Sequence, residues 1–264
     1  MADQTPRRFG AFAALALLFA AGGAGAGWWY AHSQSRPAEG DQQLEASLSS
    51  AGIDGKERAA IEGLIRTYIL EHPEVLPEAM ERLQQREASA QIAPMRGALE
   101  TAFPGAVLGN PNGKVTLVEF TDFACTYCRQ SVKAIDALVA KNPDLRVVVR
   151  ELPIIAPESA PAARMALAAA EQGKYPAYHK AMFEGPRPSD ASITAAATAA
   201  GLDLASARSF AARPDVEEEL KRNLQMARQL GINGTPAWVI GEQLVHGAVP
   251  QEDLQAAIDA ARKR

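Results

Sequence analysis

The feature that most constrains this chain is a pair of cysteines placed where a strand pattern changes to a helix pattern. Residues 115–121 form a β-branched and aromatic run of strand length, preceded by the turn signal Asn-Pro-Asn-Gly at 110–113. From Arg129 the apolar residues recur with helical spacing until Asn-Pro at 142–143. Cys125 and Cys128 therefore lie at the start of a predicted helix.

This placement favours redox chemistry. Backbone N–H groups and the positive end of a helix dipole stabilise an anion, so a thiol at a helix N-terminus ionises more readily. The thiolate is the attacking species in disulfide exchange. We assign Cys125, the more exposed of the two, as the nucleophile and Cys128, one turn later, as the resolving thiol.

Two other interpretations of the cysteine pair are a structural disulfide and half of a zinc site. The sequence holds no other cysteine, hence no second CxxC for a four-thiolate zinc site, and its four histidines lack ligand-like spacing. A disulfide that closes so short a loop removes little entropy from the unfolded chain. The strand–CxxC–helix context instead predicts a redox-active Cys125–Cys128 disulfide, with no metal and no further cofactor.

The first 30 residues predict an export signal. Arg7 and Arg8 precede an apolar run at 9–27, and Trp-Trp-Tyr follows at 28–30. Positive charge before the run predicts a cytoplasmic N-terminus and export of the remainder. The long run and its aromatic end favour an uncleaved membrane anchor, while Ala-Gly-Ala at 24–26 leaves a cleaved signal peptide open. Either way the body lies outside the cytoplasm, where dithiols can be kept oxidised.

Residues 31–43 are polar and predict a tether, and residues 44–95 predict a separate helical segment. Asp54 and Glu57 form a capping-box-like helix start, and a second helix opens at Pro73 or Pro77. A segment of about fifty residues with two apolar stripes cannot bury much surface alone. The stripes must pack on the next domain, on one another as a hairpin, or on other copies of the chain.

Residues 96–264 predict an α/β domain with a helical insert at about 156–231. A helix between the second and third strands makes these two strands parallel, and the last two strands form an antiparallel hairpin before a final helix. The predicted strands are residues 107–109, 115–121 and 145–152, then a return to strand over 231–240, and residues 243–246.

Composition agrees with a globular protein of one large or two modest domains. The chain is 47% hydrophobic and 22% charged, over 264 residues. Its net charge is −4 and its basic residues are dispersed, which argues against a nucleic-acid partner.

Several motifs together resemble the DsbA-like branch of the thioredoxin superfamily. Within that branch the chain is similar to the bacterial suppressor-of-copper-sensitivity protein C group, through Ile-Leu-Glu-His-Pro-Glu-Val-Leu at 69–76. The resemblance covers residues 50–264 and implies an α/β, thioredoxin-like fold with an inserted helical subdomain. The motifs are Val-Glu-Phe at 118–120, Phe-Ala-Cys-Thr-Tyr-Cys at 123–128, Arg-Glu-Leu-Pro at 150–153, Gly-Thr-Pro at 234–236 and Gly-Ala-Val-Pro at 247–250.

The resemblance implies further site residues. Thr235 and Pro236 resemble the family's cis-proline loop, which lies beside the active-site sulfur and leaves backbone free to pair with an extended substrate. The alternative is an ordinary trans turn proline. Glu119 precedes Cys125 by six residues, where the family has a buried acid that could relay a proton for Cys128. The alternative is an outward-facing strand glutamate.

Three aromatic residues are candidates for an apolar groove that binds unfolded polypeptide. They are Phe123, Tyr127 and Trp238. Core packing is the alternative for Phe123 and Trp238, so the sequence leaves their role open.

The dipeptide between the cysteines departs from the family pattern. Strongly oxidising DsbA proteins have Pro-His there and the copper-sensitivity group usually has Pro-Tyr, whereas this chain has Thr126-Tyr127. Tyrosine is a weaker, uncharged donor, so we expect a less depressed pKa for Cys125 and a less oxidising couple. Thr235 before the cis-proline also resembles disulfide isomerases more than DsbA, which has valine there.

We therefore predict a periplasmic protein thiol–disulfide oxidoreductase that leans toward isomerase or reductase activity. Its expected partners are unfolded or misbridged periplasmic proteins, a membrane redox partner and other copies of the chain, assembled as a trimer through residues 44–95. The alternatives are a DsbA-like dithiol oxidase, a surface protein with a vestigial redox fold, and a copper-tolerance protein that binds Cu(I) through Cys125 and Cys128. No methionine or histidine cluster in the sequence supports the copper alternative.

Overall fold

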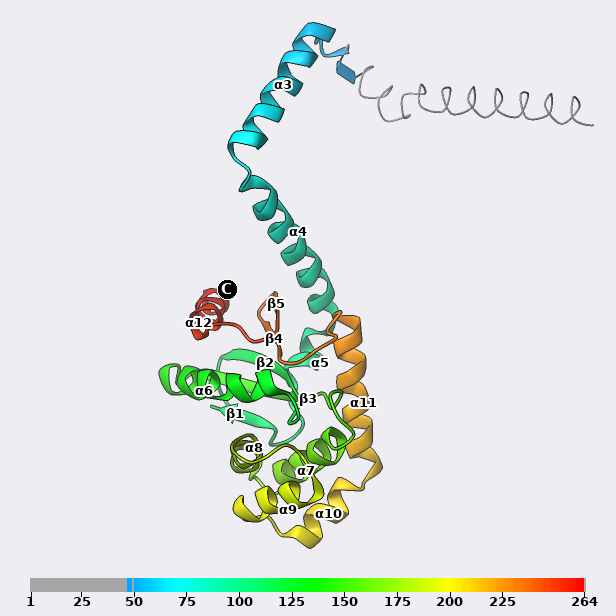
Figure 1. The fold of residues 1–264 in the computed structure, drawn as a ribbon, viewed down its shortest axis with the longest axis vertical. Coiled ribbons are helices and arrows are strands. Elements are labelled where there is room, and N and C mark those ends of the chain that lie inside the picture. The colour runs from blue at the N-terminus through cyan, green and yellow to red at the C-terminus, as the bar shows by residue number, and fades with distance from the viewer. Residues whose placement is uncertain (1–46, 49, 264) are drawn as a thin grey trace, which may run out of the picture. The chain divides into compact units, whose positions relative to one another are not determined.

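The structure, a computed structural model, describes residues 47–48 and 50–263. The predicted anchor or signal peptide (1–30) and tether (31–43) lie outside the described residues. The described chain divides into two units, with the boundary between residues 76 and 77. In chain order the elements labelled in Figure 1 are α3 (Gly55–Glu71), α4 (Val75–Ile92), the 3₁₀ turn η1 (Ala93–Met95), α5 (Arg96–Glu100), β1 (Val107–Gly109), β2 (Val115–Thr121), α6 (Thr126–Lys141), β3 (Leu145–Glu151), α7 (Ser159–Glu171), α8 (Tyr175–Glu184), α9 (Asp190–Ala199), α10 (Leu204–Ala211), α11 (Pro214–Gln229), β4 (Ala237–Ile240), β5 (Gln243–His246) and α12 (Gln251–Arg262).

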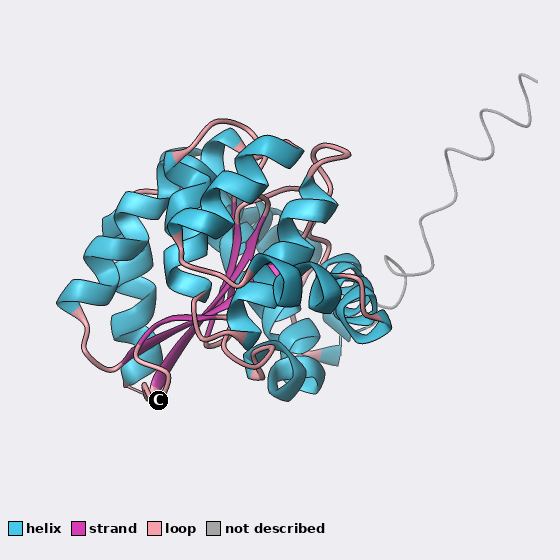
Figure 2. Ribbon diagram, turned by 90° about the horizontal axis from the view of Figure 1, so that it is seen from below, coloured by secondary structure: helices cyan, strands magenta, loops and turns pink. Residues whose placement is uncertain are grey.

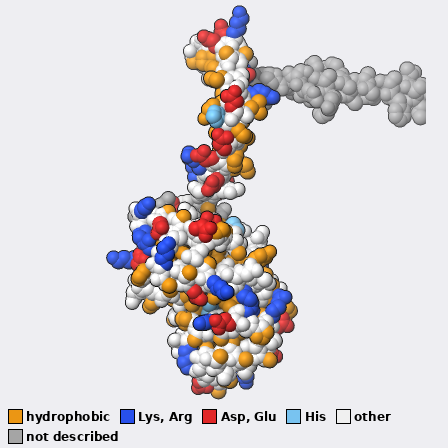
Figure 3. Space-filling model, turned by 60° about the vertical axis from the view of Figure 1, so that its left-hand side comes forward, with side chains coloured by type: hydrophobic (Ala, Val, Ile, Leu, Met, Phe, Trp, Pro, Cys, Tyr) orange, Lys and Arg blue, Asp and Glu red, His pale blue; other side chains and the backbone are white. Residues whose placement is uncertain are grey.

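Helix α3, in the first unit, starts with the predicted capping box. The Asp54 side chain accepts the backbone N–H groups of Lys56 and Glu57, and the Glu57 side chain accepts that of Asp54. No residue of α3 is buried, and hydrophobic side chains lie on its surface (Figure 3). Its large exposed apolar side chains are Ile61, Leu64, Ile65, Tyr68 and Leu70.

None of the helices formed by the described residues is long and apolar enough to cross a bilayer.

The second unit is built on a mixed sheet with strand order β1-β3-β2-β4-β5 (Figure 1). β2 and β3 are parallel, which confirms the prediction from the strand–helix–strand order, and Thr121 lies opposite Glu151. β1 pairs antiparallel with β3, β4 pairs antiparallel with β2, and β4 and β5 form the predicted hairpin. Because Phe120 lies opposite Ala237, the end of β2 lies beside the start of β4.

Helices cover both faces of this sheet (Figure 2). The first face carries Leu117, Val147 and Trp238, which pack in one apolar cluster with residues of α6, α7, α8 and α12. The second face carries Val118 and Val148, which pack in another cluster with residues of α5, α11 and the end of α4. Successive side chains of a strand point to opposite faces, so adjacent residues of β2 or β3 enter different layers.

Helices α7–α11 lie between β3 and β4, as predicted for the insert. α7 is rich in alanine, and most of its side chains are buried against other helices of the insert. Such small side chains allow close backbone approach. Gly105, with φ +82°, lies where a Cβ would collide with the carbonyl oxygen of Ala170. The insert therefore packs directly on the loop before β1.

The start of the second unit differs from the sequence prediction. η1 and α5 follow α4, where we predicted only the end of the helical segment. Ile92 and Leu99 are fully buried in the second-face cluster, because their apolar side chains complete the layer over β2 and β3. The end of the predicted 44–95 segment thus belongs to the core of the second unit.

Candidate active site

The loop that carries the cysteines is held by Asp122, directly after β2. One oxygen of its carboxylate accepts the backbone N–H of Ala124 at 2.8 Å. The other accepts those of Ile154 and Ile155, after β3, at 2.8 and 2.9 Å. The Asp122 carbonyl also accepts the N–H of Cys125 at 3.0 Å. One buried acid therefore fixes the cysteine loop to the end of the neighbouring strand.

Cys125 is the N-cap residue of α6. Its sulfur accepts the backbone N–H of Cys128 at 3.1 Å and lies 3.2 Å from the carbonyl oxygen of Thr235. The Cys128 thiol has the largest effect in lowering the pKa of Cys125 to about 6, against the opposing effect of burial; the neighbouring Thr235 side chain and the backbone N–H groups of Cys128 and Tyr127 act in the same direction. Cys125 is therefore mostly a thiolate at pH 7.

Cys128 has the opposite electrostatic environment. It is 0% exposed, against 5% for Cys125. Burial, and then the neighbouring Cys125 thiol, raise the pKa of Cys128 above its ordinary value. The arrangement supplies one ready nucleophile and one thiol that needs a base, which fits the predicted roles of the two cysteines.

Glu119 lies on the first face of the sheet, in the middle of β2. It is 2% exposed, so the alternative of an outward-facing glutamate is wrong. The pKa of Glu119 is raised to about 8, mainly by burial; the neighbouring Thr121 side chain acts to lower it and the charge of Cys125 acts to raise it. Its Oε2 has no hydrogen-bond partner among the described residues. A buried carboxyl that titrates near neutrality is suited to proton transfer.

The Thr235–Pro236 peptide bond is cis, as the resemblance implied. The antiparallel pairing of β4 with β2 brings this loop to the cysteines, although Thr235 and Cys125 are 110 positions apart in the chain. The Pro236 carbonyl accepts the N–H of Gly247 at 2.8 Å, which ties the loop to the residues after β5.

The predicted aromatic groove is only partly present. Tyr127 is 61% exposed beside the cysteines, where it can contact a bound chain. Phe123 and Trp238 are buried, so core packing, the alternative given for both, is confirmed and neither residue lines a groove. Phe123 packs against three rings of α8, those of Tyr178, His179 and Phe183, and Trp238 fills the first-face cluster.

Sequence reasoning missed a second buried acid on the same face. Glu151 is 1% exposed and accepts a hydrogen bond of 2.7 Å from the Tyr175 hydroxyl. Burial raises the pKa of Glu151 well above its ordinary value, and the charges of Asp122 and Glu119 act in the same direction. The available signal was a glutamate at the end of an otherwise apolar strand, two positions out of register with Glu119.

His179, on α8, is also buried near the site. Its ring contacts those of Phe123, Tyr175 and Phe183, and its Nε2 has no hydrogen-bond partner in the part of the chain that the structure describes. Burial lowers the pKa of His179 to about 4, so the ring is neutral at pH 7.

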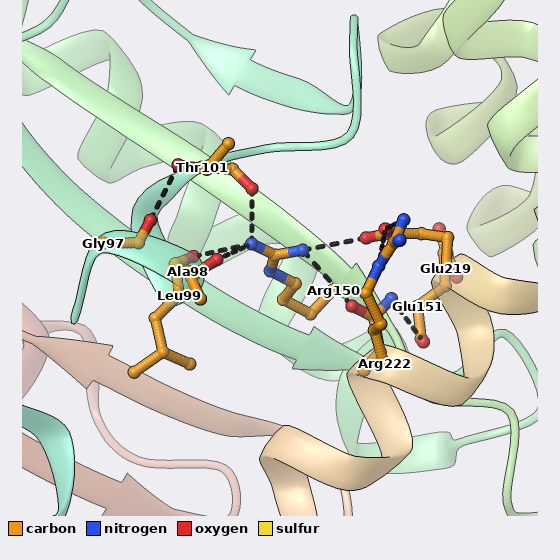
Figure 4. Close-up of polar contacts among 9 residues, drawn as sticks. Gly97, Ala98, Leu99, Thr101, Arg150, Glu151, Glu219 and Arg222 are labelled. Atoms are coloured by element: carbon orange, nitrogen blue, oxygen red, sulfur yellow. Dashed lines mark hydrogen bonds and ion pairs between the residues drawn. The ribbon is translucent and has the colours of Figure 1, made fainter. Parts of the chain in front are cut away.

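The opposite face of the sheet carries a different polar cluster, centred on Arg150 (Figure 4). Its guanidinium donates to Glu219 at 2.8 Å and to Asn223 at 3.3 Å, both on α11. It also donates to the backbone carbonyls of Ala98, Leu99 and Thr101, at and after the end of α5. Arg150 therefore neutralises a buried carboxylate and satisfies helix-end carbonyls together.

Within residues 47–48 and 50–263 no group of three or more His, Cys, Asp or Glu side chains is arranged to hold a metal ion. The groups that the site brings together are the two thiols, the cis-proline loop and the buried acids.

Comparison with known families gives two matches. A model described as the DSBA-like thioredoxin domain matches residues 116–259. A model described as the copper resistance protein ScsC N-terminal domain matches residues 57–90. The first match contains the whole candidate site, and the second covers most of α3 and α4.

Solved structures of thioredoxin-like proteins also resemble this chain. A thioredoxin-like oxidoreductase from Silicibacter pomeroyi DSS-3 is 42% identical, with 60% of this chain and 92% of that chain covered and a TM-score of 0.58. A periplasmic thioredoxin-like protein from Salmonella enterica serovar Typhimurium is 32% identical, with 64% and 97% covered and a TM-score of 0.59. A linker-deleted ScsC mutant from Proteus mirabilis is 26% identical, with 80% and 97% covered and a TM-score of 0.60.

Among curated proteins the chain matches parts of Na(+)/H(+) antiporters named NhaA, at 30% identity for those of Salinispora tropica and Herminiimonas arsenicoxydans. The chain spans about a quarter of their length, 28% and 25% respectively.

Proposed function

The chain belongs to the DSBA-like thioredoxin domain family, and on that premise we propose that it reduces and reshuffles disulfides in protein clients. A thiol–disulfide oxidoreductase needs a thiolate at neutral pH beside backbone that can hold an extended chain. Cys125, with a pKa lowered to about 6, lies 3.2 Å from the Thr235 carbonyl oxygen of the cis-proline loop. This juxtaposition is the observation that carries the proposal.

In the first step the Cys125 thiolate attacks a client disulfide. A bond forms between Cys125 and one client sulfur, the client disulfide breaks, and the second client sulfur leaves as a thiolate. The N–H of Cys128 and the helix dipole, which stabilise the Cys125 thiolate, now face a neutral sulfur. The stabilisation of the Cys125 thiolate is therefore absent from the mixed disulfide.

In the second step Cys128 resolves the mixed disulfide. Its thiol gives a proton to Glu119, and the resulting thiolate attacks the sulfur of Cys125, so that the Cys125–Cys128 bond forms and the client thiolate leaves. The client gains two electrons and the protein loses two. Continued reduction then requires a dithiol reductant, the predicted membrane redox partner. If the first client thiolate instead attacks another client disulfide, the bonds are reshuffled without net electron transfer.

The lean toward reduction and isomerisation follows from the strength of thiolate stabilisation. The groups that acidify Cys125 are the Cys128 thiol, the Thr235 side chain and backbone N–H groups, all of them uncharged, and Thr126-Tyr127 adds no cation. A pKa of about 6 is well above the about 3.5 of DsbA. A less stabilised thiolate makes the reduced form less favoured and the couple less oxidising.

The test is reactivation of a scrambled, wrongly bridged ribonuclease by the reduced protein. We expect reactivation by the wild type and none by Cys125→Ala. Cys128→Ala is the matched variant, which should form a mixed disulfide with the client and release it slowly. Exchange by Cys125→Ala would end the proposal. Fast oxidation of a reduced client without reactivation of the scrambled enzyme would assign the oxidase role instead.

We further propose that copies of the chain associate through residues 44–95, three to an assembly. The support is that α3 buries none of its residues while its apolar side chains are exposed. Replacing Leu64, Ile65 and Tyr68 by serine should give a monomer in light scattering and reduce reactivation of scrambled ribonuclease, while Glu71→Ser with Glu74→Ser, also exposed, should change neither. A triple variant with wild-type mass would contradict this assignment.

The proposed location is the periplasm, where a protein disulfide reductase meets oxidised clients. The support is residues 1–30 together with the periplasmic protein from Salmonella that this chain resembles. Cell fractionation tests it, and an uncleaved anchor predicts that the protein sediments with membranes until detergent is added.

A second candidate is Cu(I) binding by the Cys125–Cys128 dithiolate. The copper resistance description of the matched N-terminal model favours it, as does the preference of Cu(I) for thiolates. Binding that survives a competing Cu(I) chelator and is lost in Cys128→Ala would support this candidate. Displacement of copper at low chelator concentration would reject it.

A further inference from the structure

Glu151 is a buried carboxyl for which the two-step exchange above has no use. It lies at the end of β3 and is 1% exposed. Its Oε1 accepts the Tyr175 hydroxyl at 2.7 Å, and its Oε2 has no partner among the described residues. Leaving a buried polar atom unpaired is costly, so its retention calls for a role.

The sheet register places Glu151 next to Glu119. In the parallel pairing of β2 with β3, Glu119 lies opposite Val149 and Thr121 lies opposite Glu151. The two glutamates are therefore diagonal neighbours on one face, within reach of long side chains. Glu119 Oε2 and Thr121 Oγ1 also lack partners within the described part of the chain. Three unsatisfied oxygens thus gather on the face of the sheet beneath the cysteines.

Two carboxyl groups in such a site cannot both ionise, because like charges repel strongly away from water. The hydroxyl of Tyr175 occupies Oε1 of Glu151 as a donor, so a proton retained by Glu151 resides on Oε2. A protonated Oε2 is a hydrogen-bond donor, and an ionised Glu119 is the acceptor that the register puts beside it. The other titratable groups whose charges act on this pair are Asp122, Cys125, Tyr175 and Tyr178.

We propose that Glu151 is a positioning residue that, oriented by Tyr175, keeps its own proton and donates it as a hydrogen bond to the Glu119 carboxylate. By stabilising that carboxylate, Glu151 increases the fraction of Glu119 able to take the proton of Cys128. The effect falls on the second step, resolution of the mixed disulfide, and not on the attack by Cys125. This inference rests on the proposed function and identifies what sets the rate of client release.

The experiment measures the two steps separately from pH 5 to 9. Attack is followed as formation of the Cys125 mixed disulfide with a disulfide-bridged peptide, and resolution as release of that peptide. Glu151→Leu removes the donor, so the inflection of the resolution rate assigned to Glu119 should rise by at least about one pH unit, with resolution about tenfold slower at pH 7. Attack should stay within about twofold of wild type.

Three variants test the donor specifically. Glu151→Gln keeps an acceptor for Tyr175 and a donor for Glu119, and should restore resolution to within a few-fold of wild type. Tyr175→Phe should move the inflection in the same direction as Glu151→Leu. Tyr178→Phe is the matched control, since that hydroxyl donates to the Ala162 carbonyl and not to Glu151, and it should leave the inflection in place.

A carboxyl NMR titration of Glu119 gives a readout independent of activity, and its midpoint should move with the kinetic inflection. If Glu151→Leu fails to fold, the comparison of Tyr175→Phe with Tyr178→Phe decides the matter. An unmoved Glu119 midpoint in the folded variants overturns the inference. Wild-type protein that forms no mixed disulfide instead overturns the proposed function, so the two failures are distinguishable.

Discussion

Arg150 and Glu151 are neighbours on β3, yet they lie in contrasting polar clusters on opposite faces of the sheet. The guanidinium of Arg150 makes hydrogen bonds to Glu219, to Asn223 and to three backbone carbonyls (Figure 4). Glu151 has one hydrogen bond, from Tyr175, and leaves an oxygen unsatisfied within the described residues. Both side chains are almost completely buried.

This difference in hydrogen bonding indicates that the Arg150 cluster is structural, whereas the cluster around Glu151 is suited to proton transfer. Around Arg150 the charges are compensated and, apart from Arg150 Nε, the polar groups of the cluster have partners among the described residues, which holds α5 and α11 against the sheet. Around Glu119 and Glu151 the carboxyls are uncompensated, so their pKa values are raised, and the pKa of Glu119, at about 8, allows its proton to be exchanged near neutral pH. Buried ionisable residues thus serve stability on one face and reactivity on the other.

The largest expected effect comes from breaking the compensated cluster. Arg150→Met leaves Glu219 and the carbonyls at the end of α5 without their main donor, so we expect the free energy of unfolding at pH 7 to fall by about 3–5 kcal/mol. Urea unfolding at pH 7 measures this loss of unfolding free energy. Adding Glu219→Leu should recover part of the loss, because a buried charge no longer lacks a partner. A single-variant loss under about 1 kcal/mol would show that the cluster is not structural.

In the uncompensated cluster around Glu119 and Glu151, removing a charged residue should raise stability at neutral pH instead of lowering it. The pKa of Glu119 is raised from 4.5 to about 8, so the folded protein retains a proton that the unfolded chain loses, and stability falls as the pH rises through that window. Glu119→Gln cannot ionise. Between pH 4 and pH 7 the wild type should therefore lose about 3 kcal/mol of stability that the variant keeps, so the stability of the variant relative to wild type should rise by about 3 kcal/mol. Equal differences from wild type at both pH values would contradict the raised pKa.

His179 should show the reverse pH dependence. Its pKa is lowered from 6.5 to about 4, so below pH 6.5 the unfolded chain takes up a proton that the folded protein does not, and stability is lost as the pH falls toward 4. His179→Phe removes this effect. Between pH 7 and pH 5 it should lose about 2 kcal/mol less than wild type in urea unfolding. An unchanged slope would argue that His179 is protonated in the folded protein.

The smallest effect is expected at the exposed edge of the Arg150 cluster. Arg222 bonds Glu219 at 2.6 Å but its side chain is 59% exposed, where solvent screens the interaction. Arg222→Ala should cost less than about 1 kcal/mol of unfolding free energy. It is the matched control for Arg150→Met, since both remove a partner of the same carboxylate. Similar losses of unfolding free energy in both variants would show that burial of the partner does not matter to the Glu219 carboxylate.

Much of the fold was predictable because local sequence and tertiary burial agree there. The β-branched run at 115–121 and the helical spacing after Arg129 defined β2 and α6, and their order defined the parallel pairing. The cysteines, Glu119 and Pro236 could be placed because short motifs carry them. α5 was missed because five residues give no clear period.

The remaining site residues could not be placed because their surroundings come from distant segments. Phe123 looked suitable for a groove, but its burial depends on three rings of α8. Glu151 looked like an ordinary strand-end acid until the hydroxyl of Tyr175, 24 positions away, was seen to contact it. A charged residue in a strand usually faces water, and only tertiary contacts show the exception.

The distance along the chain between Cys125 and Thr235 bears on the protein's own synthesis. The sulfur of Cys125 contacts the carbonyl oxygen of Thr235, 110 positions further along, and β4 reaches β2 only through the sheet. A chain whose C-terminal strands have not yet joined the sheet therefore has the cysteine loop without the cis-proline loop beside it.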